Sequence, residues 1–130
     1  MTNAVHFKAL QRKLKFRNPN NITCLNDMHD IEFTEKELAL ASAYLDELKT
    51  KMIHYTYPGH SCYPKSFYKM IEPPLFLEYQ GDPVWLRYEN LSVVGARNMH
   101  PLTQEWLFSD MHDFLKMKPS VALISGGAVG

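Results

Sequence analysis

Several features are scarce or missing in this sequence of 130 residues, and each absence excludes a class of protein. Only two cysteines occur, Cys24 and Cys62, which are too few for a disulfide framework, so we expect reduced thiols. No apolar run approaches the roughly 18 residues needed to cross a bilayer, and the N-terminus shows no pattern of a secretory signal. We therefore expect a cytoplasmic protein.

Net charge is also missing, because 14 basic side chains balance 14 acidic ones. The bulk balance therefore gives no electrostatic argument for binding nucleic acid or an anionic membrane. The first 26 positions contain no acidic residue, so every charged side chain in this stretch is basic. Those positions predict a short amphipathic helix, a loosely docked arm, or simply a solvated basic segment packed on its own domain. Their basic residues are Lys8, Arg12, Lys13, Lys15 and Arg17.

A helix is the clearest element of the first part of the chain, which we place at residues 1–56 and expect to be helical. The sequence from Thr34 to Glu37 fits a capping box, and Phe33 with Leu38 fits a hydrophobic staple. Apolar residues then recur at three- and four-residue steps to about Ile53, which predicts one buried face.

The second part, residues 57–130, begins with turns. Proline follows tyrosine at Pro58 and Pro64, and each proline moves its predecessor out of helical geometry. A short helix over residues 65–71 and a strand over residues 75–79 are predicted to follow.

The last forty residues predict a strand–helix–strand unit. Residues 91–94 and 121–124 are short apolar runs of strand type, and each leads directly into a loop of small residues. Between them, His100 is predicted to cap a helix with Pro101 at its first position. The pattern indicates parallel strands joined by a right-handed crossover, and hence an α/β fold.

The two small-residue loops are the candidate binding site. In an open parallel sheet, ligands collect at the carboxyl ends of strands, where loops expose backbone N–H groups and lead into helix N-termini. One guanidinium beside such loops would suit a phosphate. Neither loop forms a dinucleotide-binding fingerprint, and glycine after a strand can be ordinary turn chemistry. The candidate phosphate-binding residues are Gly95, Ala96, Arg97, Ser125, Gly126 and Gly127.

Four ordered blocks resemble the DNA-processing protein A (DprA/Smf) family in order and spacing. They cover about half of the chain and are far more specific together than any one loop. The blocks are Tyr63-Pro64, then Pro73-Pro74-Leu75-Phe76-Leu77 with Gly81-Asp82, then Val93-Val94-Gly95-Ala96-Arg97, and finally Ile124-Ser125-Gly126-Gly127-Ala128-Val129-Gly130.

The resemblance implies a protein that binds single-stranded DNA without strong sequence preference, forms dimers and delivers the DNA to the RecA recombinase during natural transformation. It implies that Arg97 contacts DNA phosphate, with Gly95 and Ala96 beside it, and that Ser125, Gly126 and Gly127 form a second contact loop. It also implies a helical N-terminal part followed by the first βαβ portion of a Rossmann-like sheet, of the type found in DprA and LOG proteins. No cofactor, catalytic residue or metal is implied.

Three departures weaken the match. Ala96 stands where the family usually has serine, residues 102–103 are Leu-Thr instead of Tyr-Gly, and Val129 replaces an arginine. The chain also ends before the family's next helix. We therefore expect a fragment, a frame-shifted product or a marginally stable domain whose DNA affinity is much weaker than that of a complete family member.

Other interpretations are weaker. His60 and Cys62 invite a zinc site with His29, His54 and Cys24, but the spacing does not fit a structural finger. A nucleotide-hydrolysing enzyme of Rossmann-like fold is the main rival, yet no carboxylate stands beside either loop, and Asp110 and Asp113 lie late in the predicted helix. A regulatory fragment that contacts a full-length homologue is a third alternative. A stacking platform for bases is also conceivable, although we favour a core role for its rings, Tyr55, Tyr57, Tyr63, Phe67 and Tyr68.

Overall fold

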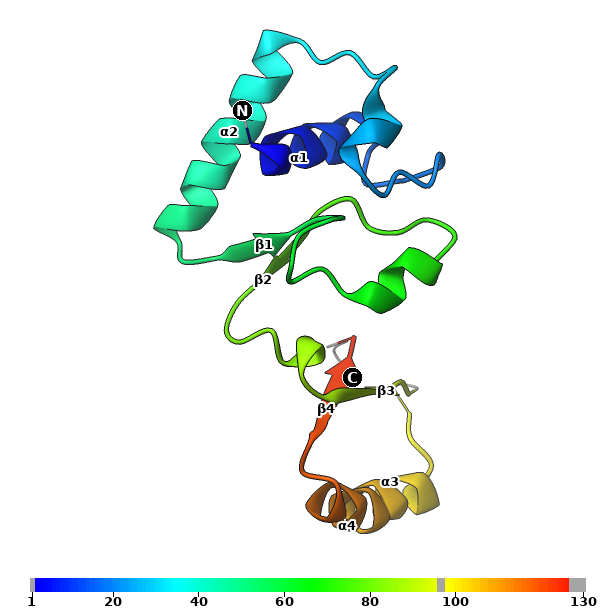
Figure 1. Cartoon of the computed structure of the whole chain (residues 1–130). Helices are drawn as coiled ribbons and strands as arrows, with labels where there is room; N and C mark the ends of the chain where they lie inside the picture. The colour runs from blue at the N-terminus through cyan, green and yellow to red at the C-terminus, as the bar shows by residue number, and fades with distance from the viewer. Residues whose placement is uncertain (1, 96–97, 127–130) are drawn as a thin grey trace. The chain divides into compact units, whose positions relative to one another are not determined.

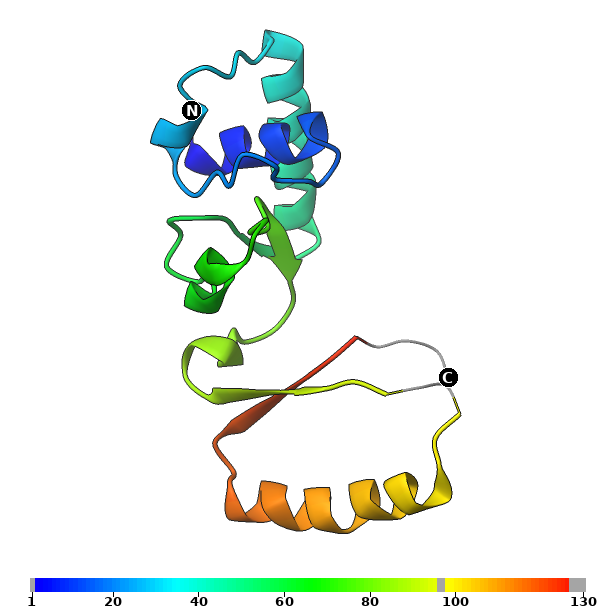
Figure 2. The same cartoon turned by 90° about the vertical axis from the view of Figure 1, so that its right-hand side faces the viewer.

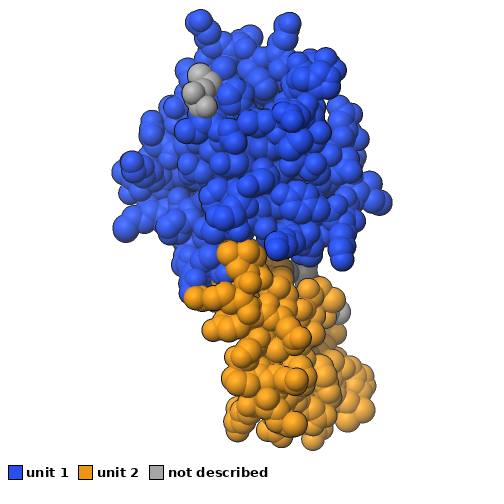
Figure 3. All heavy atoms as spheres, viewed as in Figure 1, with its two compact units in different colours: residues 1–83 blue, residues 84–130 orange. Residues whose placement is uncertain are grey.

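The computed structural model describes residues 2–95 and 98–126. The chain divides into two compact units, residues 1–83 and residues 84–130 (Figure 3). We describe each unit by itself. The domain boundary between residues 56 and 57, which the sequence suggests for this chain, stays a prediction.

Unit 1 combines two α-helices with a small antiparallel sheet and two short 3-10 helices (Figure 1). Strand β1 pairs with β2, and the register sets His54 opposite Tyr79. The elements are α1 (Asn3–Lys13), η1 (Leu25–Met28), α2 (Glu35–Thr50), β1 (His54–Thr56), η2 (Lys65–Lys69) and β2 (Leu77–Tyr79).

Helix α1 shows that the basic N-terminal segment is a structural element of the core. Phe7 is 1% exposed and Leu10 is fully buried. Even Lys8 is buried, because its ammonium group lies 3.0 Å from Glu78 Oε1 and 4.0 Å from the centre of the Tyr44 ring. The segment is therefore a packed helix and not a loosely docked arm.

Helix α2 begins where the capping box predicts. The Thr34 hydroxyl accepts from the Glu37 N–H at 3.2 Å, and the Glu37 carboxylate accepts from the Thr34 N–H at 2.8 Å. Ala41, Leu45 and Leu48 are buried against α1, as expected for one apolar face. The helix ends at Thr50, three residues earlier than predicted.

One hydrophobic core joins α1 and α2 to the segment between β1 and β2. Leu75 and Phe76 are each 2% exposed, and the Tyr55 ring stacks on Phe76 with 5.2 Å between centroids. The pairing with β1 extends only to Thr56 opposite Leu77, so β2 begins at Leu77 and not at residue 75 as predicted.

Unit 2 has a two-stranded parallel sheet and a helical layer (Figure 2). The helical stretch is divided at Ser109, which ends one helix and caps the next. The elements are η3 (Val84–Leu86), β3 (Glu89–Val93), α3 (Pro101–Phe108), α4 (Asp110–Met117) and β4 (Val121–Ser125).

The described residues of unit 2 include none that is buried. Large apolar side chains are exposed on the helices and the sheet: Leu102 is 69% exposed, Phe108 71%, Met117 81% and Leu123 50%. A parallel sheet is ordinarily covered on both faces, so this pair of strands has little core of its own.

The fold is thus mixed helix and strand, with a helical N-terminus and a small parallel sheet, which agrees with the predicted α/β class. Within residues 2–95 and 98–126, no helix is long and apolar enough to cross a membrane. Cys24 and Cys62 both lie in these ranges and form no disulfide.

Candidate nucleic-acid interface

The carboxyl ends of β3 and β4 lie side by side. The strands are parallel neighbours, and the register sets Val93 opposite Ser125. Gly95 follows the first strand end by two residues, and Gly126 directly follows the second. The two small-residue loops that the sequence indicated therefore leave the same edge of the sheet.

The structure describes only part of the predicted site. Gly95, Ser125 and Gly126 are described and exposed, whereas Ala96, Arg97 and Gly127 lie outside the described residues. Among the described residues, a side chain built on Gly95 or Gly126 would meet no atom within 4 Å. Both backbones are thus open to a ligand, and the role of all six residues in binding stays a prediction.

The N-terminus of α3 offers few free amides to an anion. Pro101 has no N–H, and the His100 Nδ1 atom accepts from the Leu102 N–H at 3.2 Å. The N–H groups of Thr103 and Gln104 donate to the His100 carbonyl at 2.9 and 3.1 Å. Any phosphate contact here must therefore come from the loops and from side chains, since the first turn of the helix already uses its donors.

The acidic side chains of unit 2 lie on β3, α3 and α4. Glu89 opens β3 and lies opposite Val121 at the other end of the sheet, about 13 Å from Val93 at the usual rise per strand residue. The acids of the first turn of α4 are Asp110 and Asp113. Among the described residues, the first carboxylate after the end of β3 is that of Glu105 in α3, twelve residues beyond Val93.

A family model, DNA recombination-mediator protein A, matches residues 54–130. The chain belongs to the DNA recombination-mediator protein A family. No curated protein and no solved structure matches the chain. Family membership indicates a role in DNA processing and recombination and agrees with the resemblance in the sequence.

The region that matches the recombination-mediator family includes part of unit 1. It begins at His54, the first residue of β1, and so contains both strands of the antiparallel sheet. Phe76 and Leu75 belong to the match but pack against α1 and α2, which precede it. Helices α1 and α2 therefore form one hydrophobic core together with the first thirty residues of the family segment.

Several aromatic rings near the start of the family segment pack in the core of unit 1. Tyr57 stacks on Phe7 at 5.3 Å between centroids. Tyr63 is 2% exposed, its hydroxyl donates to the Pro74 carbonyl at 2.8 Å, and burial strongly raises its pKa. Tyr55, Tyr57 and Tyr63 thus have the core role that we favoured over a stacking platform for bases, whereas Tyr68 is 41% exposed.

Histidine and cysteine in this segment hold a turn. His60 Nδ1 accepts from the Cys62 N–H at 3.2 Å and lies 3.2 Å from the Thr56 hydroxyl. Thr56 is only 1% exposed, so its hydroxyl is shielded from solvent. Across the described residues, no group of three or more His, Cys, Asp or Glu side chains is placed to hold a metal ion.

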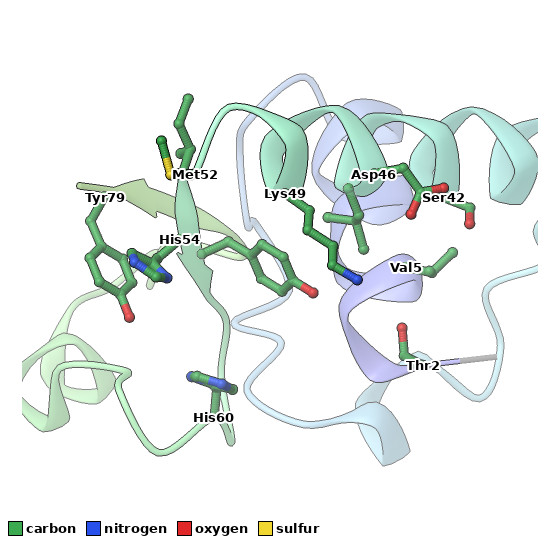
Figure 4. A pocket seen from close by; sticks show the side chains of 12 residues that line it. Thr2, Val5, Ser42, Asp46, Lys49, Met52, His54, His60 and Tyr79 are labelled. Carbon is green, nitrogen blue, oxygen red and sulfur yellow. The ribbon is translucent and has the colours of Figure 1, made fainter. Parts of the chain in front are cut away.

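A cavity of about 690 Å³ opens in unit 1 between α2, β1 and the start of α1. Lys49 extends across it from α2 toward Thr2 and Val5 (Figure 4). Tyr79 lies at the other end, stacked on His54 at 5.3 Å, and burial together with a hydrogen bond to Cys62 raises its pKa to about 12. Sequence reasoning missed this cavity, because its lining residues come from four separate segments.

Proposed function

We propose that this chain binds single-stranded DNA at the edge of the sheet where β3 and β4 end. One observation carries the proposal. In this member of the DNA recombination-mediator family, the parallel register sets Val93 opposite Ser125, so both small-residue loops begin at neighbouring strand ends. Open backbone at Gly95 and Gly126 suits a sugar-phosphate chain, and Arg97 would supply a permanent cation.

The protein acts, in this proposal, as a DNA-binding mediator and not as an enzyme. It would hold DNA for the RecA recombinase in the cytoplasm during DNA uptake, and pair with a second copy, as the family resemblance implies. Unit 2 would be the first βαβ portion of a Rossmann-like domain. Sequence-independent contact with phosphates agrees with loops that present amides and one guanidinium but few base-reading side chains.

Fluorescence anisotropy with a labelled oligothymidylate tests the proposal. We expect Arg97→Gln to weaken binding about tenfold, since a charge-assisted contact of about 1.4 kcal/mol would be lost. The slope of log affinity against log salt should fall by about 0.7, the value for one phosphate contact on a single strand.

Lys36→Gln is the matched control, because it removes one exposed cation from α2. Its affinity and salt slope should equal those of the wild type. Equal binding by wild type and Arg97→Gln would overturn the proposed site. A preference for duplex DNA, or hydrolysis of a nucleotide that depends on the same loops, would overturn the proposed function.

A further inference from the structure

An exposed phenylalanine follows α1 in unit 1. Phe16 is 75% exposed, although it lies only three residues after the end of α1, whose last buried residue is Gln11. Lys15 and Phe16 both have positive backbone φ, 50° and 68°, in the left-handed region that favours glycine. The chain thus adopts an unfavourable backbone conformation at two successive positions while leaving a large apolar ring in water.

A second exposed apolar side chain lies next to this loop. Ile71 is 92% exposed and precedes Glu72, whose carboxylate accepts from the Arg17 guanidinium, with Nε at 3.1 Å. Asn18, which follows Arg17, donates to the Pro73 carbonyl at 2.9 Å. These contacts hold residues 15–18 beside residues 71–73, so Phe16 and Ile71 each stand one residue from the same ion pair.

A lysine lies close in the sequence to each apolar side chain: Lys15 precedes Phe16, and Lys69 lies two residues before Ile71. Within the described residues, Lys15 and Lys69 are exposed and have no ion pair, whereas Glu72 is paired with Arg17. We call Lys15, Phe16, Lys69 and Ile71 the Phe16 surface. The acid within residues 15–18 and 69–73 is Glu72, and Arg17 neutralises its charge. The surface therefore presents two cations, an aromatic ring and an aliphatic side chain.

We propose that the Phe16 surface is a second contact for single-stranded DNA, in which Phe16 stacks on a base while Lys15 and Lys69 contact the flanking phosphates. The proposal rests on the proposed function for the identity of the partner, but it concerns unit 1 and not the strand ends. Every base has a face that can stack, so such a contact is independent of sequence. Cations beside an aromatic ring favour a polyanion over an uncharged apolar partner.

Binding to two labelled strands of equal length tests the proposal in the full chain. One strand is oligothymidylate, and the other is an abasic phosphodiester with no bases to stack. Phe16→Ala should weaken binding to oligothymidylate at least about fivefold, the lower end of the effect of base–aromatic stacking, and leave binding to the abasic strand unchanged. Phe16→Trp should retain the wild-type affinity.

Phe108→Ala is the matched control, because Phe108 is 71% exposed on unit 2. It should bind both strands like the wild type. The unfolding temperature of Phe16→Ala should also be unchanged, since the ring is exposed and the Arg17–Glu72 pair is retained.

Replacing both lysines tests the electrostatic part. Lys15→Gln with Lys69→Gln should lower the salt slope by about 1.4, which is about 0.7 for each of two phosphate contacts. An unchanged slope would overturn the assignment of these two lysines.

The outcomes separate the two proposals. Equal binding by Phe16→Ala and the wild type, with weaker binding by Arg97→Gln, overturns the Phe16 surface alone. The reverse pattern overturns the strand-end site alone. Binding to vesicles of phosphatidylserine and phosphatidylcholine that depends on Phe16, without dependence for oligothymidylate, would show that the surface contacts a membrane instead.

Discussion

At the residue scale, single polar side chains connect segments that lie far apart in the sequence. Asn18 is 2% exposed, and its amide donates to the carbonyls of Ile22 and Pro73, each at 2.9 Å. Its oxygen accepts from the Ile22 N–H at 2.8 Å. The sequence contains no local signal for this role, because Pro73 lies 55 residues away.

Asn18→Ala should therefore destabilise the protein by about 2–3 kcal/mol, since it leaves buried backbone groups without partners. Thermal or urea unfolding measures the change. Asn20→Ala is the control, because Asn20 is exposed, and it should alter the free energy of unfolding by less than about 0.5 kcal/mol. If the two variants were equally stable, the bridging role of Asn18 would be refuted.

Acid should weaken the fold through carboxylates that accept hydrogen bonds. The backbone N–H and hydroxyl of Thr34, with Lys13, hold the pKa of Glu37 below its ordinary value of 4.5. A carboxyl with a lowered pKa in the folded state stabilises the fold above its unfolded pKa, and this contribution is lost as the pH falls through the folded pKa.

Glu37→Gln should accordingly lose less stability than the wild type between pH 7 and pH values below 4.5. Urea unfolding at a series of pH values measures the difference. Parallel curves for the two proteins would contradict the expected coupling.

At the element scale, the sequence predicted the structures that depend on local signals. The capping box located the start of α2, and His100 with Pro101 located the start of α3. The apolar runs predicted β4 and the second half of β3, which begins two residues earlier than predicted, at Glu89. By contrast, β1 was missed because its three residues form a strand only by pairing with β2, more than twenty residues later.

Burial of α1 could not be predicted in full for the same reason. Lys8 reads as a solvated charge in the sequence, but it is buried because Glu78 and the Tyr44 ring neutralise and cover it. For the candidate site, the apolar runs predicted that the two strand ends are neighbours. They did not predict that the Leu102 N–H in the first turn of α3 is already bonded, because this bond depends on the cap geometry of His100.

The cap of α2 provides a test at this scale. Thr34→Ala removes the hydroxyl that accepts from the Glu37 N–H and should cost about 1 kcal/mol of stability. Thr34→Ser keeps a hydroxyl at the same position and should cost much less. Denaturant unfolding measures the free energy of unfolding of both variants. An equal loss for alanine and serine would contradict a role of the hydroxyl as the helix cap.

At the scale of the whole molecule, the core belongs to unit 1. All buried residues in the described ranges lie within residues 1–83, whereas unit 2 has none. Opening of unit 2 should therefore require less free energy than opening of unit 1.

Hydrogen exchange followed by mass spectrometry or NMR measures this difference. We expect amides of α1 and α2 to exchange slowly, and those of α3, α4, β3 and β4 to exchange much faster in the free protein. Comparable protection in both units would show that unit 2 is stabilised by contacts that its burial does not indicate.

The central claim is that the ends of β3 and β4 form a binding edge for single-stranded DNA. An NMR titration of the isotopically labelled full chain with an unlabelled oligothymidylate tests it most directly, because each amide reports its own surroundings. The account predicts large shifts at Gly95 and Arg97 and at Ser125, Gly126 and Gly127. Saturable binding that leaves all of these amides unshifted would contradict it.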